Sequence, residues 1–135
     1  GTPAWDKLFA TLIPFNQSWA QRASALIIVI SAQQTGSGAE AKLNPSHEFD
    51  SGAAWAYLAL QTSLQGWHAH AMTGIDKDLV RKNLEIPQEF TVQAAVAIGR
   101  RSEDKSFLAE ALQVREAPSP RLPLKDIAAE GKFGF

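Results

Sequence analysis

One arginine of this chain stands in a segment stiff enough to hold its side chain in place. It is Arg121, in the run Pro118-Ser119-Pro120-Arg121-Leu122-Pro123. Because proline fixes the backbone dihedral φ, this guanidinium is carried on a pre-organised segment, and its planar fork suits a bidentate contact to a phosphate. The same residues are also compatible with a solvated arginine, or with a PxxP ligand for an SH3-like domain. Arg100 and Arg101, at the end of a predicted strand, are further candidates for a phosphate contact.

Two histidines, His68 and His70, form a His-x-His pair. On a β-strand both side chains would point to the same face, where imidazoles can bind a metal ion. No third ligand stands at a recognisable spacing, and His47 falls in a predicted loop. We therefore favour structural or surface roles for these histidines and predict no metal site.

Two other kinds of site are disfavoured by the sequence. The spacing Gly36-x-Gly38-x-x-Ala41 resembles a dinucleotide-binding glycine motif, but Pro45 leaves no room for the helix that such glycines must open. No glycine and serine pattern typical of a nucleophile elbow is present, and the chain has no cysteine to act as a nucleophile or thiolate ligand. We predict no catalytic side chain.

The overall charge limits the class of partner. The 135 residues carry 13 basic and 14 acidic side chains, a formal net charge of −1, which argues against a polybasic nucleic-acid surface. The longest apolar runs, 25–30 and 53–60, are too short to span a membrane, and no signal peptide opens the chain. We expect one domain over residues 1–135, in the cytoplasm, with no nucleic-acid or membrane partner.

Helical and extended patterns alternate along the chain, as in an α+β fold. Apolar spacing and the positions of proline and glycine predict helices at about 5–13, 16–23, 50–66, 76–84 and 103–114. Runs of β-branched and apolar residues predict strands at 24–32, 67–72 and 91–98. The polar stretch 35–46 is predicted to be a surface loop.

The third predicted helix is the most unusual of these elements. Asp50 or Ser51 can cap its start, and Gly66 should end it. Residues 53–60 leave almost no polar face, so this helix must be covered all round, either centrally in its own domain or by a partner subunit. The proline-rich tail from Ala117 cannot build a core and should lie extended across another surface, such as that of a second subunit.

Several short motifs, taken in order, resemble the FMN-dependent nitroreductase family. The longest is the stretch 49–76, FDSGAAWAYLALQTSLQGWHAHAMTGID, which is similar to the family's Asp-(Ser/Thr)-Gly-Ala-Ala start, long apolar helix, Gly turn and Gly-(Phe/Ile)-Asp close. The others are Asn16-Gln17-x-Trp19-Ala20, Ala97-Ile98-Gly99-Arg100, Arg121-Leu122-Pro123-Leu124 and Glu130-Gly131-Lys132-Phe133-Gly134. The ordered set covers nearly the whole chain.

The resemblance implies a homodimer of α+β fold, a three-layer α-β-α sandwich with the long apolar helix at the dimer interface and the arm 117–135 wrapped around the partner. It also implies FMN as the cofactor at that interface, NAD(P)H as the electron donor, and a nitroaromatic, quinone or similar small molecule as the acceptor. Hydride then passes to and from flavin N5, so the cofactor carries the chemistry and the protein needs no nucleophile or general base.

Matched residue by residue, the resemblance assigns six cofactor-binding positions. The segment Ala71-Met72-Thr73-Gly74 matches the one that lies along the flavin, where the Thr73 backbone N–H would address N5 and Gly74 would allow a close backbone approach. Arg121 matches the tail arginine that binds the FMN phosphate, and Ser119 stands where some relatives have a lysine. Family members often carry glutamate at the position of Thr73, so the contacts that position nicotinamide are left open.

One departure from the family pattern leaves alternatives. Members begin with a segment bearing an Arg-Ser-x-Arg-type pattern that supplies further phosphate and flavin contacts, and this chain has no equivalent. The chain is then either a fragment of a longer protein or a shortened relative with a damaged cofactor site. The leading interpretation is a flavin-dependent oxidoreductase, and the alternative is a non-catalytic dimeric remnant that has lost full FMN binding.

Overall fold

The computed structural model describes residues 1–134 of the chain. Two compact units make up the chain, Gly1–Glu103 and Asp104–Phe135. The first contains the main sheet and most of the helices, and the second contains short helical turns joined by extended chain. The α+β class predicted from the sequence is confirmed, whereas a single domain over residues 1–135 stays a prediction.

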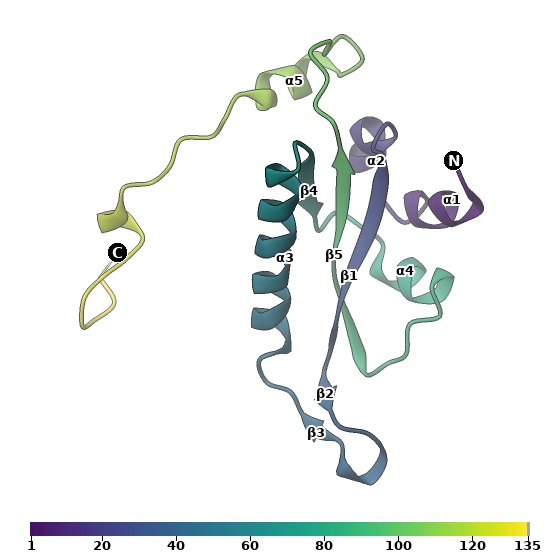
Figure 1. The fold of residues 1–135 in the computed structure, drawn as a ribbon, viewed down its shortest axis with the longest axis vertical. Helices are drawn as coiled ribbons and strands as arrows, with labels where there is room; N and C mark the ends of the chain where they lie inside the picture. Colours follow the sequence, from purple (N-terminus) through teal and green to yellow (C-terminus); the bar gives the residue numbers. More distant parts are fainter. Residues whose placement is uncertain (135) are drawn as a thin grey trace. The chain divides into compact units, whose positions relative to one another are not determined.

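A three-stranded antiparallel sheet lies at the centre of the first unit. Its strands are β1 (Ala25–Ala32), β4 (His68–Met72) and β5 (Phe90–Gly99), arranged in the order β1-β5-β4 (Figure 1). Their β-branched and small apolar residues suit strands that are covered by other elements. All three predicted strands are confirmed, each to within about one residue at either end.

Helices lie on both sides of this sheet. On one side are α1 (Pro3–Phe9), α2 (Pro14–Ala20) and α4 (Lys77–Asn83), and on the other is α3 (His47–Leu64) (Figure 1). The main core fills the space between the sheet and the three short helices, and it includes Val80, Val92 and Ala95, which are almost fully buried. Such short helices are not stable alone, so this shared core is what holds them.

The boundary between the first two helices differs from the prediction. Helix α1 ends at Phe9, so Leu12 and Ile13 are not helical, and Pro14 begins α2 instead of stopping α1. Proline is favoured there because the first residue of a helix needs no N–H donor. Leu12 forms a β-bridge with Ile75, which holds this part of the chain against the segment that follows β4.

Helix α3 begins earlier than predicted. Its first residue is His47, and neither Asp50 nor Ser51 caps its start. Ser46 occupies the N-cap position without a side-chain cap bond, and its hydroxyl donates instead to Asp50 Oδ2 at 2.8 Å. Glu48 and Asp50 lie in the first turn, where negative charge favours a helix N-terminus, so polar residues before the apolar run extend the helix.

The other end of α3 is as predicted. The helix ends at Leu64, and Gly66 follows with a φ of 73°. The Gly66 N–H donates to the Ser63 carbonyl and the Trp67 N–H to the Thr62 carbonyl, both at 3.0 Å. This pair of bonds is a Schellman motif, whose left-handed residue is most easily glycine.

Helix α3 covers the sheet with one face only. Its buried and half-buried residues recur every three or four positions and are His47, Ser51, Trp55, Leu58, Ala59 and Thr62. The opposite face is apolar and exposed, with Phe49, Tyr57, Leu60 and Leu64 at 81, 74, 57 and 75% exposure. We call these four residues the outer stripe of α3. The helix is therefore apolar on both faces, as the sequence predicts, but the rest of the first unit leaves the outer stripe uncovered.

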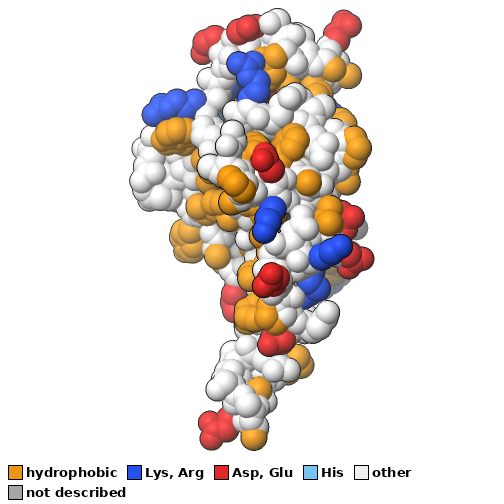
Figure 2. Space-filling model, turned by 90° about the vertical axis from the view of Figure 1, so that its right-hand side faces the viewer, with side chains coloured by type: hydrophobic (Ala, Val, Ile, Leu, Met, Phe, Trp, Pro, Cys, Tyr) orange, Lys and Arg blue, Asp and Glu red, His pale blue; other side chains and the backbone are white. Residues whose placement is uncertain are grey.

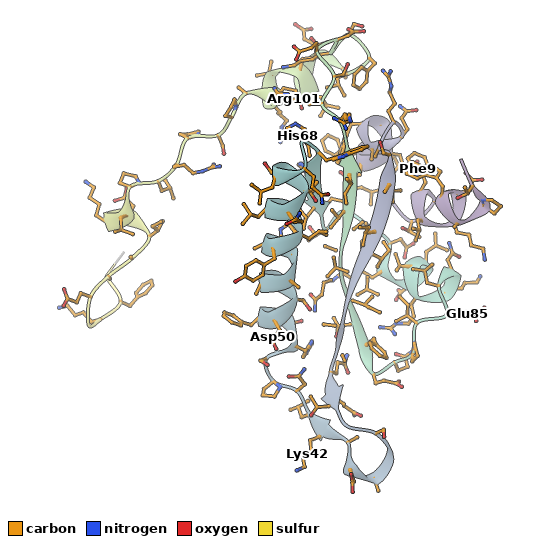
Figure 3. All side chains as sticks on the ribbon, viewed as in Figure 1. Phe9, Lys42, Asp50, His68, Glu85 and Arg101 are labelled. Atoms are coloured by element: carbon orange, nitrogen blue, oxygen red, sulfur yellow. The ribbon has the colours of Figure 1, made fainter. Side chains whose placement is uncertain are left out.

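The predicted surface loop over 35–46 contains a small hairpin. Strands β2 (Gln34–Thr35) and β3 (Lys42–Leu43) pair antiparallel around a 3₁₀ turn, η1 (Gly38–Glu40). Gly36 and Gly38 both have positive φ, 80° and 56°, so the two glycines serve a tight turn rather than the start of a helix. Lys42 lies in this hairpin, at the opposite end of the first unit from His68 (Figure 3).

The second unit contains little regular structure. Helix α5 covers only Glu110–Gln113, and two 3₁₀ turns follow, η2 (Val114–Glu116) and η3 (Leu124–Asp126). The helix predicted over 103–114 is therefore wrong for most of its length. Asp104 Oδ1 accepts the Ser106 N–H at 2.9 Å, so a local turn replaces the expected first turns of helix. Residues 117–123 are neither helical nor paired in a sheet, as their prolines predict.

Charged side chains are interspersed on the side of the first unit that carries α1 and α4. Figure 2 shows basic and acidic side chains mixed over this face, with apolar groups between them. Within the described part of the chain, no helix combines the length and the apolarity that crossing a membrane requires.

Candidate functional site

The predicted flavin-facing segment, Ala71 to Gly74, begins within β4, which is an edge strand of the sheet. The Ile98 carbonyl accepts the Ser24 N–H at 2.8 Å, so the backbone groups of Ile98 face β1. Successive residues of a strand turn their backbone groups to opposite sides. The backbone groups of Ala95 therefore face β4, where they meet those of Met72.

The same alternation fixes the direction of the next N–H groups in β4. Since the backbone N–H and C=O groups of Met72 face β5, the N–H groups of Ala71 and Thr73 point the other way, to the open edge of the sheet. Thr73 is exposed, and among the described residues no acceptor is found for its N–H or for that of Gly74. The edge therefore offers unpaired N–H donors to the acceptor atoms of a ligand.

Gly74 is held by two groups from the N-terminal part of the chain. Its carbonyl oxygen accepts the Ile13 N–H at 3.2 Å and the Asn16 Nδ2 group at 2.8 Å. A Cβ atom on Gly74 would lie 2.6 Å from Asn16 Nδ2 and 2.7 Å from Ile13 Cδ1, closer than real Cβ atoms come to a neighbour. Glycine thus allows a close approach at this position, and the neighbours it admits are Ile13 and Asn16. Its approach to a flavin stays a prediction.

Two further backbone bonds fix the chain between β4 and α4. The Ile75 N–H donates to the Thr73 carbonyl at 2.9 Å, and the Asp76 N–H donates to the Thr11 carbonyl at 2.8 Å. Asp76 then caps α4, because its Oδ1 accepts the Leu79 N–H at 2.9 Å. The segment that follows β4 is therefore an ordered connection, anchored at both ends.

Ser119 and Arg121 contact each other in the second unit. Arg121 Nη1 donates to Ser119 Oγ at 3.1 Å and to the Ser119 carbonyl oxygen at 3.4 Å. Both residues are exposed, and a guanidinium has further N–H groups that can bind an anion such as a phosphate. The six predicted cofactor-binding residues thus fall into two groups, 71–74 in the first unit and this pair in the second.

The other candidate residues make aromatic and surface contacts. The His70 ring meets Trp19 edge-on, with 4.9 Å between the ring centroids, and Arg100 lies 4.4 Å from the centroid of the Trp67 ring. His68 lies at the start of β4 and Arg101 follows the end of β5 (Figure 3). In the described residues, no group of three or more His, Cys, Asp and Glu side chains could hold a metal ion.

Sequence reasoning misses a polar cluster on the α3 side of the sheet. Ser31 is only 6% exposed, and its Oγ lies 2.8 Å from His47 Nδ1 and accepts Gln93 Nε2 at 2.8 Å. Gln93 is the extra residue at a shift in the β1–β5 register. Through these contacts the cluster links the start of α3 to strands β1 and β5. Its sequence signal is a single serine in an apolar run, which does not identify the partners.

Sequence reasoning also misses the contact of Asn16 with Gly74. Asn16 belongs to the motif Asn16-Gln17-x-Trp19-Ala20, but the spacing of that motif does not indicate that the amide reaches a loop 58 residues further on. The signal that could find it is the pairing of a buried asparagine with a glycine that tolerates no side chain.

Comparison with known proteins identifies the family. No protein-family model matches the chain. An uncharacterised 15.4 kDa protein of Mycolicibacterium smegmatis is 31% identical over 138 residues, covering 99% of this chain and 90% of that protein. A solved structure described as an oxidoreductase containing FMN is 47% identical, with a TM-score of 0.93, over 98% of this chain and 67% of that one. A nitroreductase family protein from Clostridium difficile 630 has a TM-score of 0.67 at 15% identity, over 98% and 70%.

This chain belongs to the FMN-dependent nitroreductase family. The prediction from its ordered motifs is confirmed. The nitroreductase fold is also found in an FMN- and NADPH-dependent nitroreductase from Sphigopyxis sp. strain HMH, with a TM-score of 0.60 at 15% identity, over 88% of this chain and 50% of that one. At such low identity the last two likenesses show the nitroreductase fold alone.

Proposed function

We propose that this nitroreductase-family chain is a flavin-dependent oxidoreductase, which takes electrons from NAD(P)H and passes them through FMN to a nitroaromatic, quinone or similar small molecule. The observation that carries the proposal is the open edge at the end of β4, where the N–H groups of Thr73 and Gly74 are left without an acceptor in the described chain. The 47% identity to an oxidoreductase containing FMN supports the choice of cofactor. We expect the reaction to take place in the cytoplasm.

The residues present fit the two ends of FMN. Oxidised flavin N5 is a hydrogen-bond acceptor, and the edge of β4 turns the Thr73 N–H outward, where it can donate. The phosphate needs a cationic donor, and Arg121 supplies an exposed guanidinium braced by Ser119. Bound FMN would supply hydride transfer at N5, so the chain itself has to bind and orient the cofactor and needs no nucleophile.

A homodimer is part of the proposal because the outer stripe of α3 is not covered by the rest of the first unit. Phe49, Tyr57, Leu60 and Leu64 form a row of large apolar side chains along one helix face. Contiguous apolar patches of this kind mark interaction sites. A second copy could cover the stripe with its own stripe in a two-fold symmetric contact. The arm from Ala117 would then lie on the partner subunit, with FMN at the interface.

Titration of the purified protein with FMN tests the proposed function. We expect saturable binding, seen as quenched flavin fluorescence and a flavin absorbance spectrum that stays with the protein after gel filtration. NADPH or NADH added without oxygen should bleach that absorbance, and a nitroaromatic or quinone should restore it. A folded protein that stays colourless in excess FMN contradicts the proposal and supports the non-catalytic dimeric remnant.

Replacing Thr73 by proline should weaken FMN binding about three- to tenfold. Proline removes the N–H proposed to face N5, and one neutral hydrogen bond contributes about 0.5–1.5 kcal/mol. The sheet should tolerate the change, because this N–H points away from β5 and the preceding Met72 is already extended. Thr73→Val is the matched control, since it keeps the N–H and loses the hydroxyl. Equal FMN dissociation constants for the two variants would contradict the N5 contact.

A further inference from the structure

Asn16 is a buried polar residue that lies where α2 meets the end of β4. The residue as a whole is 6% exposed. Nδ2 donates to the Gly74 carbonyl oxygen at 2.8 Å, and Oδ1 accepts the Trp19 indole N–H at 3.3 Å. An indole N–H can only donate, so the bond from Trp19 identifies Oδ1 and leaves Nδ2 as the group that faces Gly74.

The Gly74 carbonyl receives a second bond from the same region. The Ile13 N–H donates to it at 3.2 Å, just before α2 begins. A carbonyl oxygen has two lone pairs, so these two donors satisfy it fully. The peptide group between Gly74 and Ile75 is therefore fixed in its orientation. The only side chain in this arrangement is that of Asn16, among the residues described.

Fixing this peptide limits the conformations open to Thr73. On the upstream side, the pairing of Met72 with Ala95 holds the peptide whose N–H belongs to Thr73. On the downstream side, the Thr73 carbonyl accepts the Ile75 N–H at 2.9 Å. The Gly74 N–H belongs to the same peptide group as that carbonyl and points in the opposite direction, so it points away from the turn that the Thr73–Ile75 bond closes. The N–H groups of Thr73 and Gly74 thus lie between two fixed points of the backbone, the pairing of Met72 in the sheet and the hydrogen-bonded Gly74 carbonyl.

We propose that Asn16 is a positioning residue for the cofactor-facing backbone. By holding the Gly74 carbonyl it keeps the Thr73 and Gly74 N–H groups in the direction in which a flavin would meet them. We call the contact between Asn16 Nδ2 and the Gly74 carbonyl the Asn16 clamp. The identity of the ligand rests on the proposed function, whereas the clamp itself is a property of the cofactor-free chain.

Two variants break the clamp from its two sides. Asn16→Leu roughly keeps the volume and removes the donor, and Gly74→Ala places a methyl group against Nδ2. Asn83→Leu is the matched control, because Asn83 Nδ2 also donates to a distant backbone carbonyl, that of Lys7 at 3.1 Å, in another part of the unit. Trp19→Phe removes the other bond of the Asn16 amide and leaves Nδ2 able to donate.

The first measurement needs no flavin. In the cofactor-free protein, we expect the amide hydrogen exchange of Ile75 and Asp76, relative to Val80 in α4, to rise about three- to tenfold in both clamp variants. Asn83→Leu should leave this ratio unchanged, because a general loss of stability raises exchange at all three amides alike. An unchanged ratio in the clamp variants overturns the clamp, whether or not the protein binds FMN.

The second measurement is made on bound FMN. The clamp variants should weaken FMN binding about three- to tenfold. They should also shift the flavin midpoint potential to more positive values, because only oxidised N5 accepts the N–H that is no longer held in place. The two control variants should change neither quantity. Faster exchange with an unchanged potential overturns the positioning role. A parent protein that binds no FMN overturns the proposed function and this role together, while the exchange ratio still decides the clamp.

Discussion

If the proposed homodimer forms through the outer stripe of α3, replacing Leu60 by aspartate should convert it into a monomer. Leu60 lies in the outer stripe of α3, between Tyr57 and Leu64 on the exposed face of the helix. If the outer stripe packs against the outer stripe of a second copy, the substitution removes about 2–3 kcal/mol of apolar burial from each chain and places a carboxylate in an apolar contact. A two-fold contact carries the defect twice, so the dimer dissociation constant should rise at least about a thousandfold.

Sedimentation over a range of protein concentrations measures this effect. Ala54→Asp is the matched control, because it places the same charge at an exposed position of α3 that lies outside the outer stripe. The control should sediment as the parent does. A parent protein that is a single chain at all concentrations, or a Leu60→Asp variant that remains dimeric, would show that the outer stripe is not the subunit interface.

Removing the guanidinium of Arg121 should weaken FMN binding about ten- to a hundredfold. A hydrogen bond that involves a charged group contributes about 1.5–3 kcal/mol, and Arg121 is the cation that the family resemblance assigns to the phosphate. Arg121 is exposed, and its bonds go to the neighbouring Ser119, so Arg121→Ala should leave the free energy of unfolding nearly unchanged. Quenching of flavin fluorescence during an FMN titration gives the dissociation constant.

Two controls separate a phosphate contact from a general charge effect. Lys125→Ala removes a positive charge from another exposed position of the same unit, and it should leave FMN affinity unchanged. Riboflavin lacks the phosphate, so its affinity should be the same for the parent and for Arg121→Ala. If Arg121→Ala weakens riboflavin as much as FMN, Arg121 does not bind the phosphate.

Local patterns are sufficient to predict the sheet and one end of α3. The apolar run of β1 contains four consecutive β-branched residues, which favour a strand, and Gly66 takes the positive φ that ends a helix. The start of α3 lies in a polar stretch outside the apolar run, where Glu48 and Asp50 favour the first turn of the helix. At the start of the helix expected over 103–114, Asp104 Oδ1 accepts the Ser106 N–H, a bond that competes with helical bonds. Leu12 has helical spacing, but its bridge to Ile75 comes from a distant part of the chain.

The candidate site shows the same division between local and distant information. The motif brings Ala71 to Gly74 together because they are consecutive. That the N–H groups of Ala71 and Thr73 face an open edge follows from the strand order β1-β5-β4, which a sequence of short strands does not specify. The contact of Asn16 with Gly74 depends on how α2 meets the end of β4. The cofactor contacts of Ser119 and Arg121 stay predictions.

The bond between Asn16 and Gly74 also bears on the order in which the molecule folds. It joins residues 58 positions apart, and closing so long a loop has an entropic cost that local helix formation does not have. Single helices and hairpins form within microseconds from residues that are near in sequence. We therefore expect the turn after β4 to reach its final conformation among the last events of folding. FMN binding would then indicate that the chain is completely folded, whereas the earlier gain of helical structure would not.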